Sequence, residues 1–380
     1  TVSSQERVNL SDLFFYGTLR YLPLLQRVLG RPLSEITFHS AKLRDHAVHA
    51  VQGQDFPMIL SAEGAVAEGL LVQGLSSDDL ARLAYYEGSF DYDLKSLKVI
   101  LEDGGEVQAQ VFFPTPGAWQ PGELWSLQGW ADKLGEVTAL AAEEEMAYFG
   151  KVDPKTMARS VRAIQTRAWA KIMAGQRRTG DPRNIAEDVI VHRHERVYVD
   201  YFGMEEIDLQ FRQHDGSMGP VLHRGGLMQG SAVSVLPYDP IRDTVLLVEQ
   251  FRPPVFLIND PEPWLWEAVA GMIDPGETPE QTAHREAMEE AGVRFDRLEY
   301  AGGAYSSSGS STGFMYLYVG LGSLTETTIT GGLDTEGEDI RSRILPFDEF
   351  IDMTDRHLFK DLQLVSLAYW LARHRDRLRA

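Results

Sequence analysis

Apolar and polar positions divide the chain into three stretches of different character. In residues 9–118, short apolar runs such as LFFYGTL, GLLVQGL and VQAQVFF are separated by glycine, aspartate and serine. Runs of this kind between turn formers predict strands. One segment, YLPLLQRVLG, has helical spacing and ends at Gly30, a residue suited to a helix C-cap. We expect a small α/β barrel domain here.

Residues 119–180 have a helical pattern instead. They are rich in Ala, Leu, Glu, Lys and Arg, and apolar residues recur at spacings of three and four. We interpret this stretch as a helical connector. The acidic run Glu143–Glu145 is expected to be a solvated helix face, because charge runs usually face water.

Residues 181–380 alternate again between strand and helix patterns. SAVSVLPYDPIRDTVLLVEQF predicts two strands joined by a turn at Asp239-Pro240, and DLQLVSLAYWLARHRDRL predicts a final amphipathic helix. Between them, Thr278 and Pro279 form a helix start and Gly292 a helix end. A helix over residues 279–291 is therefore expected.

Composition limits the classes of function. The 380 residues carry a formal net charge of −20, which disfavours binding to nucleic acid or to an anionic membrane surface. The chain has no cysteine, so disulfides, thiolate metal sites and cysteine nucleophiles are excluded. No stretch of about 18 apolar residues predicts a membrane helix. We expect a cytoplasmic protein that acts on a small molecule.

The expected helix over residues 279–291 carries the strongest chemical signal. Glu286, Glu289 and Glu290 are three and four residues apart, which places their carboxylates on one helix face. Like charges repel unless a cation lies among them, and carboxylate oxygens suit Mg²⁺ or Mn²⁺. Arg285 is positioned to pair with Glu277 and to brace the preceding loop.

These residues resemble the Nudix box, G-x5-E-x7-R-E-U-x-E-E-x-G-U, in which U is a bulky apolar residue. Every fixed position is met, although Ala287 is small for its apolar position; the matching residues are Gly271, Glu277, Arg285, Glu286, Glu289, Glu290 and Gly292. A match of this length is a far more specific signal than a lone glycine-rich triplet. The resemblance implies an α/β/α sandwich that hydrolyses diphosphates.

The surrounding segments, VLPYDPIRDTVLLVEQFR, WLWEAVAGMI and GGLDTEGEDIR, are similar to the ADP-ribose pyrophosphatase branch of Nudix hydrolases. This resemblance implies Mg²⁺, with Mn²⁺ as an alternative, and a nucleoside diphosphate substrate. By matching positions it implies metal ligands at Glu286, Glu290, Glu338 and the Ala270 carbonyl; catalytic roles for Glu289 and for Glu336 as general base; and a phosphate contact at Arg252.

The branch also implies a homodimer in which an aromatic residue stacks on the base. Here Tyr201 or Phe202 matches that aromatic residue, and Arg224 or His223 matches the group that faces it. One segment departs from the pattern. Where the branch has Ser-Pro-Gly-Gly-(Ser/Thr) followed by an acid, this chain has SSSGSSTGF from Ser306, so the choice of substrate is open.

Residues 9–118 resemble the gamma-glutamylcyclotransferase-like (AIG2-like) family. Tyr16, Gly17 and Leu19 match its Tyr-Gly-x-Leu motif, which binds the substrate's carboxylate, and Glu87 matches its acid/base glutamate. This implies a γ-glutamylamine cyclotransferase, or a binding module that keeps only the fold. The two-domain arrangement is similar to that of tellurite-resistance proteins of the TrgB type.

Other functions stay open at this level. The Nudix portion could hydrolyse another nucleoside diphosphate sugar, or sense a nucleotide without cleaving it. The pair His192 and His194 could suggest a metal site, but no third ligand lies nearby in sequence, so we expect a structural or surface role.

Overall fold

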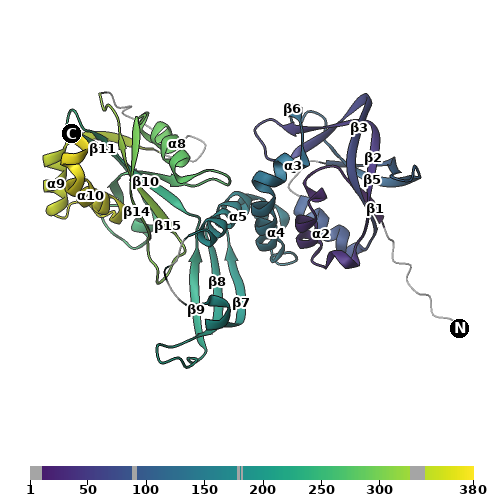
Figure 1. Ribbon diagram of the computed structural model, residues 1–380, viewed down its shortest axis with the longest axis horizontal. Coiled ribbons are helices and arrows are strands. Elements are labelled where there is room, and N and C mark those ends of the chain that lie inside the picture. Colours follow the sequence, from purple (N-terminus) through teal and green to yellow (C-terminus); the bar gives the residue numbers. More distant parts are fainter. Residues whose placement is uncertain (1–10, 88–91, 178–179, 181–182, 326–338) are drawn as a thin grey trace. The chain divides into compact units, whose positions relative to one another are not determined.

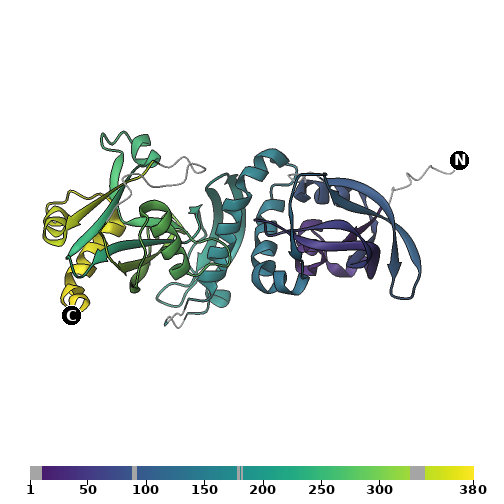
Figure 2. The same cartoon turned by 90° about the horizontal axis from the view of Figure 1, so that it is seen from above.

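The computed structural model describes residues 11–87, 92–177, 180, 183–325 and 339–380 (Figures 1 and 2). The chain forms two compact units that meet in sequence between Ala168 and Trp169. Each unit has its own apolar core and is described separately below.

The first unit is built on a closed barrel. Its strands follow the order β3-β1-β5-β4-β2, and β2 pairs with β3 to close the sheet. The pairing of β1 with β5 is parallel, and the other pairings are antiparallel. The strands are β1 (Ser11–Phe15), β2 (Thr37–Val51), β3 (Pro57–Leu75), β4 (Tyr92–Leu101) and β5 (Glu106–Pro114). The expected small α/β barrel is confirmed.

Helices cover one side of this barrel. Helix α1 (Leu22–Leu29) buries Leu24, Leu25 and Val28, and Gly30 ends it with a φ of 68°, a left-handed conformation that glycine adopts without strain. The other helices of the unit are η1 (Thr18–Arg20), η2 (Leu33–Glu35), α2 (Ser77–Glu87), α3 (Leu127–Trp130), η3 (Ala131–Gly135), α4 (Glu136–Met146) and the start of α5 (Pro154–Gly175).

Part of the stretch predicted as a helical connector belongs to the first unit. Its first residues form β6 (Pro121–Leu124), which pairs with β2 of the barrel sheet. Helix α4 then packs on α1 and α2. The predicted solvated face at Glu143–Glu145 is wrong for two of its three residues. Glu144 is buried in an ion pair with the buried Arg167 of α5, and Glu145 is buried beside α2.

The second unit contains a mixed sheet of seven strands. Its main path is β12-β11-β10-β15-β14, with β13 paired to β10 and β16 paired to β11. The strands are β10 (Ala232–Asp239), β11 (Thr244–Phe251), β12 (Trp264–Glu267), β13 (Val269–Met272), β14 (Arg297–Tyr305), β15 (Phe314–Leu321) and β16 (Arg341–Pro346). The predicted turn between β10 and β11 is present, with Tyr238 paired to Val245.

Helices cover both faces of this sheet, which confirms the expected sandwich. On one face, α8 (Pro279–Ala291) packs its alanines on Val233 and Val235, together with Trp169 and Met173 from the end of α5. On the other face lie α9 (Phe347–Asp355) and α10 (Leu362–Arg379), whose apolar residues pack on Leu236 and Tyr238 (Figure 1). The short helices α6 (Ile185–Asp188) and α7 (Pro253–Leu257) complete the unit.

A three-stranded antiparallel sheet precedes the sandwich. It consists of β7 (Val189–Val199), β8 (Gly203–Phe211) and β9 (Leu222–Met228). His192 contacts Gln210, and His194 contacts Glu205, so each histidine has its own partner across the strands. In the described part of the chain, no helix is both long enough and apolar enough to cross a membrane.

Candidate active site

Helix α8 presents the acidic residues, and its ends are fixed locally. Thr278 accepts a hydrogen bond from the Gln281 amide, and the Gln281 side chain accepts one from the Thr278 amide, which together form a capping box. Pro279 occupies the first turn, and Gly292 ends the helix with a φ of 63°. The predicted helix over residues 279–291, including both of its ends, is confirmed.

Arg285 is the centre of an ion-pair network around this helix. Its Nε and Nη2 atoms donate to the two carboxylate oxygens of Glu277, at 3.0 and 2.9 Å, which confirms the predicted brace. Nη1 donates to Glu286 at 2.6 Å and to Glu289 at 3.2 Å. Burial acts to lower the pKa of Arg285, but its bonds to Glu277 and the charge of Glu286 outweigh burial and raise that pKa.

The backbone of β13 lies directly against the carboxylates of α8. A Cβ atom added to Gly271 would lie 1.9 Å from Oε1 of Glu286, so only glycine leaves room for that carboxylate. The preceding residue of the strand, Ala270, donates its amide hydrogen to Oε2 of Glu290 at 3.2 Å. Glu290 is only 2% exposed. The strand and the helix therefore hold two carboxylates against one short stretch of backbone.

These donors suit a hard divalent cation, because carboxylate and carbonyl oxygens are the ligands that Mg²⁺ prefers. Within the described residues, no three acidic or histidine side chains converge as a complete ligand set. Arg285 forms hydrogen bonds with the carboxylates of Glu286 and Glu289. The expected ligand Glu338 and the expected base Glu336 lie outside the described residues. The described carboxylates of a chemistry that suits such a metal are those of Glu286 and Glu290, beside the backbone of Gly271 and Ala270.

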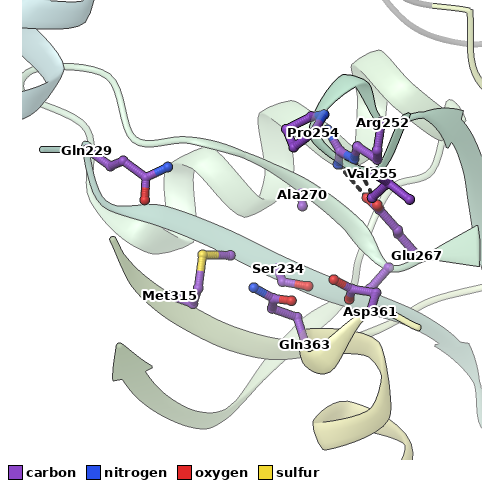
Figure 3. A pocket seen from close by; sticks show the side chains of 11 residues that line it. Gln229, Ser234, Arg252, Pro254, Val255, Glu267, Ala270, Met315, Asp361 and Gln363 are labelled. Carbon is purple, nitrogen blue, oxygen red and sulfur yellow. Dashed lines mark hydrogen bonds and ion pairs between the residues drawn. The ribbon is translucent and has the colours of Figure 1, made fainter. Parts of the chain in front are cut away.

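A pocket of about 490 Å³ opens beside Ala270 (Figure 3). Its lining residues come from β10, β12, β13, β15, α7, the start of α10 and the segments between them. Its lining residues are Gln229, Ser234, Arg252, Pro254, Val255, Glu267, Ala268, Ala270, Met315, Asp361 and Gln363. Ala270 lines the pocket and also donates its amide hydrogen to Glu290, so it is the residue that the pocket and the acidic helix share.

The charged side chains of the pocket are coupled to one another. Arg252 donates to both carboxylate oxygens of Glu267, through Nε at 2.8 Å and through Nη2 (Figure 3). Burial acts to lower the pKa of Arg252, but this ion pair outweighs it and raises that pKa. Asp361 caps α10 by accepting from the Leu364 amide at 2.7 Å. Burial raises the pKa of Asp361 to about 6.

The residues expected at the base-binding position lie elsewhere in the second unit. Tyr201 and Phe202 form the turn between β7 and β8, where their rings meet edge to face and Tyr201 is 65% exposed. Arg224 and His223 lie on β9, and His223 contacts Asp208. None of these four residues lines the pocket described above. The structure brings Arg252 and Ala270 together with the helix α8 acids, but places the expected aromatic residues on a separate sheet.

In the first unit, the expected substrate-binding motif follows β1. Tyr16 and Leu19 are buried, and Gly17 precedes the single turn η1. Glu87 ends α2. Burial raises the pKa of Glu87 to about 7, and burial together with the charge of Glu87 raises the pKa of Glu145 to about 8. Two neighbouring carboxylic acids in this unit therefore hold protons near neutral pH.

Comparison with known proteins assigns both units. Residues 228–365 match the family model described as NUDIX domain. The chain is 31% identical over 192 residues to the ADP-ribose pyrophosphatase of Escherichia coli (strain K12), covering 50% of this chain and 91% of that protein.

The chain belongs to the Nudix family.

Other relatives of this Nudix hydrolase carry two different names. The ADP-ribose pyrophosphatase of Haemophilus influenzae is 32% identical over 42% of this chain and 74% of that protein. The GDP-mannose pyrophosphatase of Yersinia enterocolitica is 32% identical over 38% of this chain and 75% of that protein. Residues 13–131 match a second family model, described as gamma-glutamyl cyclotransferase, AIG2-like.

Sequence reasoning did not find most of the residues that line the pocket of this Nudix hydrolase. The polar and charged ones among them are Gln229, Ser234, Glu267, Asp361 and Gln363. Glu267 had a signal, because it is a lone charge in the apolar run WLWEAVA. Asp361 precedes a helix pattern and so resembles an ordinary helix cap. The segment SSSGSST, which departs from the family pattern, is linked directly to the pocket. Its Ser311 donates a hydrogen bond to the side chain of Gln229, one of the lining residues.

Proposed function

We propose that this Nudix hydrolase cleaves the diphosphate of ADP-ribose and releases AMP and ribose 5-phosphate, with Mg²⁺ as its metal and Mn²⁺ as an alternative. The observation that carries the proposal is at Ala270, which donates its amide hydrogen to the buried carboxylate of Glu290 and also lines a pocket. The names of the Escherichia and Haemophilus relatives support the choice of substrate.

Glu286, Glu290 and the Ala270 carbonyl would hold the metal. When bound, Mg²⁺ neutralises charge on the phosphate oxygens, which diphosphate hydrolysis requires. Arg285 holds Glu286 and Glu289 in place through its hydrogen bonds. Glu289 would act as a ligand or support the ligands. Glu336 would take the proton of the attacking water, and Glu338 would add a ligand.

Other parts of the proposal concern the rest of the substrate. The Nη1 atom of Arg252, which Glu267 does not engage, would donate to a phosphate oxygen. Tyr201 or Phe202 would stack on the base, with Arg224 or His223 facing it. Since these residues lie outside the pocket, a homodimer that joins two Nudix domains would supply them to the site from the partner subunit.

The test is to incubate the purified full-length chain with ADP-ribose and Mg²⁺ and to separate the products by chromatography. We expect AMP from the wild type and almost none from Glu290→Gln. Glu349→Gln on α9 is the matched control, because its side chain is half-exposed and far in sequence from the box. Equal AMP production by Glu290→Gln and the wild type would refute the proposed site.

Two outcomes would favour the alternatives. Cleavage of GDP-mannose rather than ADP-ribose would favour another nucleoside diphosphate sugar, in line with the Yersinia relative and the SSSGSST segment. Binding of these compounds without cleavage of any would favour a nucleotide-sensing module.

We propose a second activity for the first unit, the cyclisation of γ-glutamylamines. The supporting observation is the pKa of Glu87, raised to about 7, because an acid/base group works best with a pKa near the working pH. Glu87 would move one proton from the attacking amine to the leaving amine, while Tyr16, Gly17 and Leu19 would bind the carboxylate end of the substrate. Glu87→Gln should abolish 5-oxoproline formation and leave AMP formation intact. The reverse pattern in Glu290→Gln would complete the test.

A further inference from the structure

Arg177, just beyond the end of α5, joins parts of the second unit that are far apart in sequence. Its Nη1 atom donates to the Tyr305 hydroxyl at 3.2 Å, and its Nη2 atom donates to Oγ of Ser231 at 3.4 Å. The guanidinium carbon lies 3.6 Å from the centroid of the Phe314 ring, a close cation–π contact. Ser231, which precedes β10, is only 2% exposed. One arginine therefore links the start of β10 to both β14 and β15.

The aromatic partners of Arg177 flank the serine-rich segment, residues 306–313. Tyr305 is the last residue of β14 and Phe314 is the first residue of β15. The two residues are paired across the strands, and their ring centroids are 5.1 Å apart. Because Arg177 contacts both rings, it holds the two ends of the serine-rich segment together.

The middle of the serine-rich segment holds Gln229, a residue that lines the pocket beside Ala270. Ser311 donates its hydroxyl hydrogen to Oε1 of the Gln229 side chain. Oγ1 of Thr312 accepts from the Gln229 backbone amide at 2.8 Å and donates to the Gln229 backbone carbonyl at 3.1 Å. These contacts fix both the backbone and the side chain of Gln229, whose amide group points into the pocket (Figure 3).

Arg177 completes a closed set of contacts, because Gln229 and Ser231 are two residues apart. The arginine holds Ser231 and the ends of the serine-rich segment, and the middle of that segment holds Gln229. Arg177 itself does not line the pocket, and its hydrogen bonds to the described residues do not reach the acids of α8. Any influence of this arginine on the pocket therefore passes through Gln229.

We propose that Arg177 is a positioning residue of the hydrolase. By holding the serine-rich segment against Ser231, it fixes the orientation in which Gln229 donates to the part of the substrate that enters the pocket. The proposal rests on the proposed hydrolase activity and adds a residue outside the match to the NUDIX domain, residues 228–365. A residue that orients a binding group, without contact to the reacting atoms, changes substrate binding more than the chemical step. Loss of Arg177 should therefore raise KM and leave kcat nearly unchanged.

The first measurement is hydrogen–deuterium exchange of the substrate-free, full-length chain, which tests the positioning without any activity. Arg177→Met removes the charge and both hydrogen bonds but keeps an unbranched side chain over Phe314, so the fold should be retained. The reporters are the backbone amides of Leu227 and Thr312, which donate across the junction at 2.8 and 3.0 Å. We expect them to exchange roughly five- to tenfold faster than in the wild type, since local opening becomes easier when its bracing contacts are lost.

The matched control for this measurement is Arg356→Met at the end of α9. The Arg356 side chain is 64% exposed and pairs with Asp352 four residues away. Its variant should leave the exchange of Leu227 and Thr312 unchanged. Unchanged exchange of these two amides in Arg177→Met as well would overturn the proposal.

The second measurement asks whether Arg177 acts through Gln229. Steady-state kinetics are compared for Arg177→Met, Gln229→Ala and the double variant, with Mg²⁺ and whichever of ADP-ribose and GDP-mannose the wild type cleaves faster. We expect KM to rise roughly tenfold in each single variant, the loss of one hydrogen bond to substrate, while kcat changes less than about twofold. The double variant should be no worse than Gln229→Ala alone, because an effect that passes through a residue disappears with that residue.

The outcomes separate this proposal from the proposed function. Additive losses in the double variant, a fall in kcat alone, or faster exchange with an unchanged KM would each overturn the role of Arg177. If the wild type binds these compounds without cleaving them, the hydrolase activity is wrong, and the same cycle of variants on dissociation constants decides the role of Arg177. A wild type that neither binds nor cleaves them would overturn both proposals.

Discussion

The acid pair of the first unit predicts an unusual dependence of stability on pH. Glu145 is 7% exposed, and its pKa is raised from 4.5 to about 8 by burial and by Glu87. The folded state therefore keeps a proton that the unfolded chain releases above about pH 4.5. Unfolding releases that proton throughout this window, so the free energy of unfolding falls as pH rises from about 4.5 to about 8.

The size of the effect follows from the same pKa shift. A proton released on unfolding changes stability by about 1.4 kcal/mol per pH unit, which gives about 5 kcal/mol over the whole window as an upper limit. Glu87 titrates in the same range, so the two acids share this change rather than each contributing all of it. Glu145→Gln keeps the shape of the side chain and stays neutral at every pH. Relative to the wild type, the variant should gain up to about 3 kcal/mol between pH 6 and pH 8.

Differential scanning calorimetry of the full-length chain at several pH values from 5 to 9 measures this gain. A change of about 3 kcal/mol corresponds to roughly 6 to 12 °C in the melting temperature of a unit of this size. The matched control is Glu143→Gln on the same helix, whose side chain is 52% exposed. Its difference from the wild type should vary little with pH. A Glu145→Gln difference that is the same at pH 6 and pH 8 would refute the reasoning.

Three further changes test the second unit. Gly271→Ala places a Cβ where Oε1 of Glu286 now lies, so hydrolysis should fall at least about tenfold in a Mg²⁺ titration of kcat, with an almost unchanged melting temperature. Arg285→Lys loses the bidentate hydrogen bond to Glu277, so the Mg²⁺ concentration that gives half-maximal activity should rise about 10- to 100-fold. An unchanged Mg²⁺ titration would contradict the bracing role. Trp169→Phe removes one hydrogen bond to the Glu277 carbonyl and keeps an aromatic ring, so calorimetry should show about 1 kcal/mol less stability, or roughly 2 to 4 °C.

Helix α8 could be predicted in full because its determinants are local. The cap residues Thr278 and Gln281 lie three positions apart, and Gly292 provides the left-handed end. Arg285 and Glu277 are eight residues apart, so their ion pair was also within reach of sequence reasoning. The turn between β10 and β11 was predictable for the same reason. Interactions between residues close in sequence are fixed by residue type and spacing, and those are visible in the sequence.

The pocket beside Ala270 could not be predicted because its lining residues come from distant parts of the chain. Ser234 and Asp361 are brought together only by the pairing of the sheet and the docking of α10. Each residue alone has an ordinary interpretation, as a strand serine or a helix cap. The burial of Glu144 was hidden in the same way, because its partner Arg167 lies 23 residues further along the chain. A run of three glutamates gives no sign that the second will meet an arginine.

Helix α5 shows why the boundary between the two units was harder to predict from the sequence than the elements within each unit. Its helical pattern is uniform, yet Arg167 pairs with Glu144 in the first unit, while two residues later Trp169 donates to the Glu277 carbonyl of the Nudix box. Met173 lies in the core beneath α8, and Arg177 stacks on Phe314 of β15 at 3.6 Å. The helix therefore changes from partners in the first unit to partners in the second unit within one turn. The amino-acid composition of the helix does not indicate where this change occurs. A Nudix fragment cut at residue 181 would therefore lack the indole and the methionine that close the core beneath its catalytic helix.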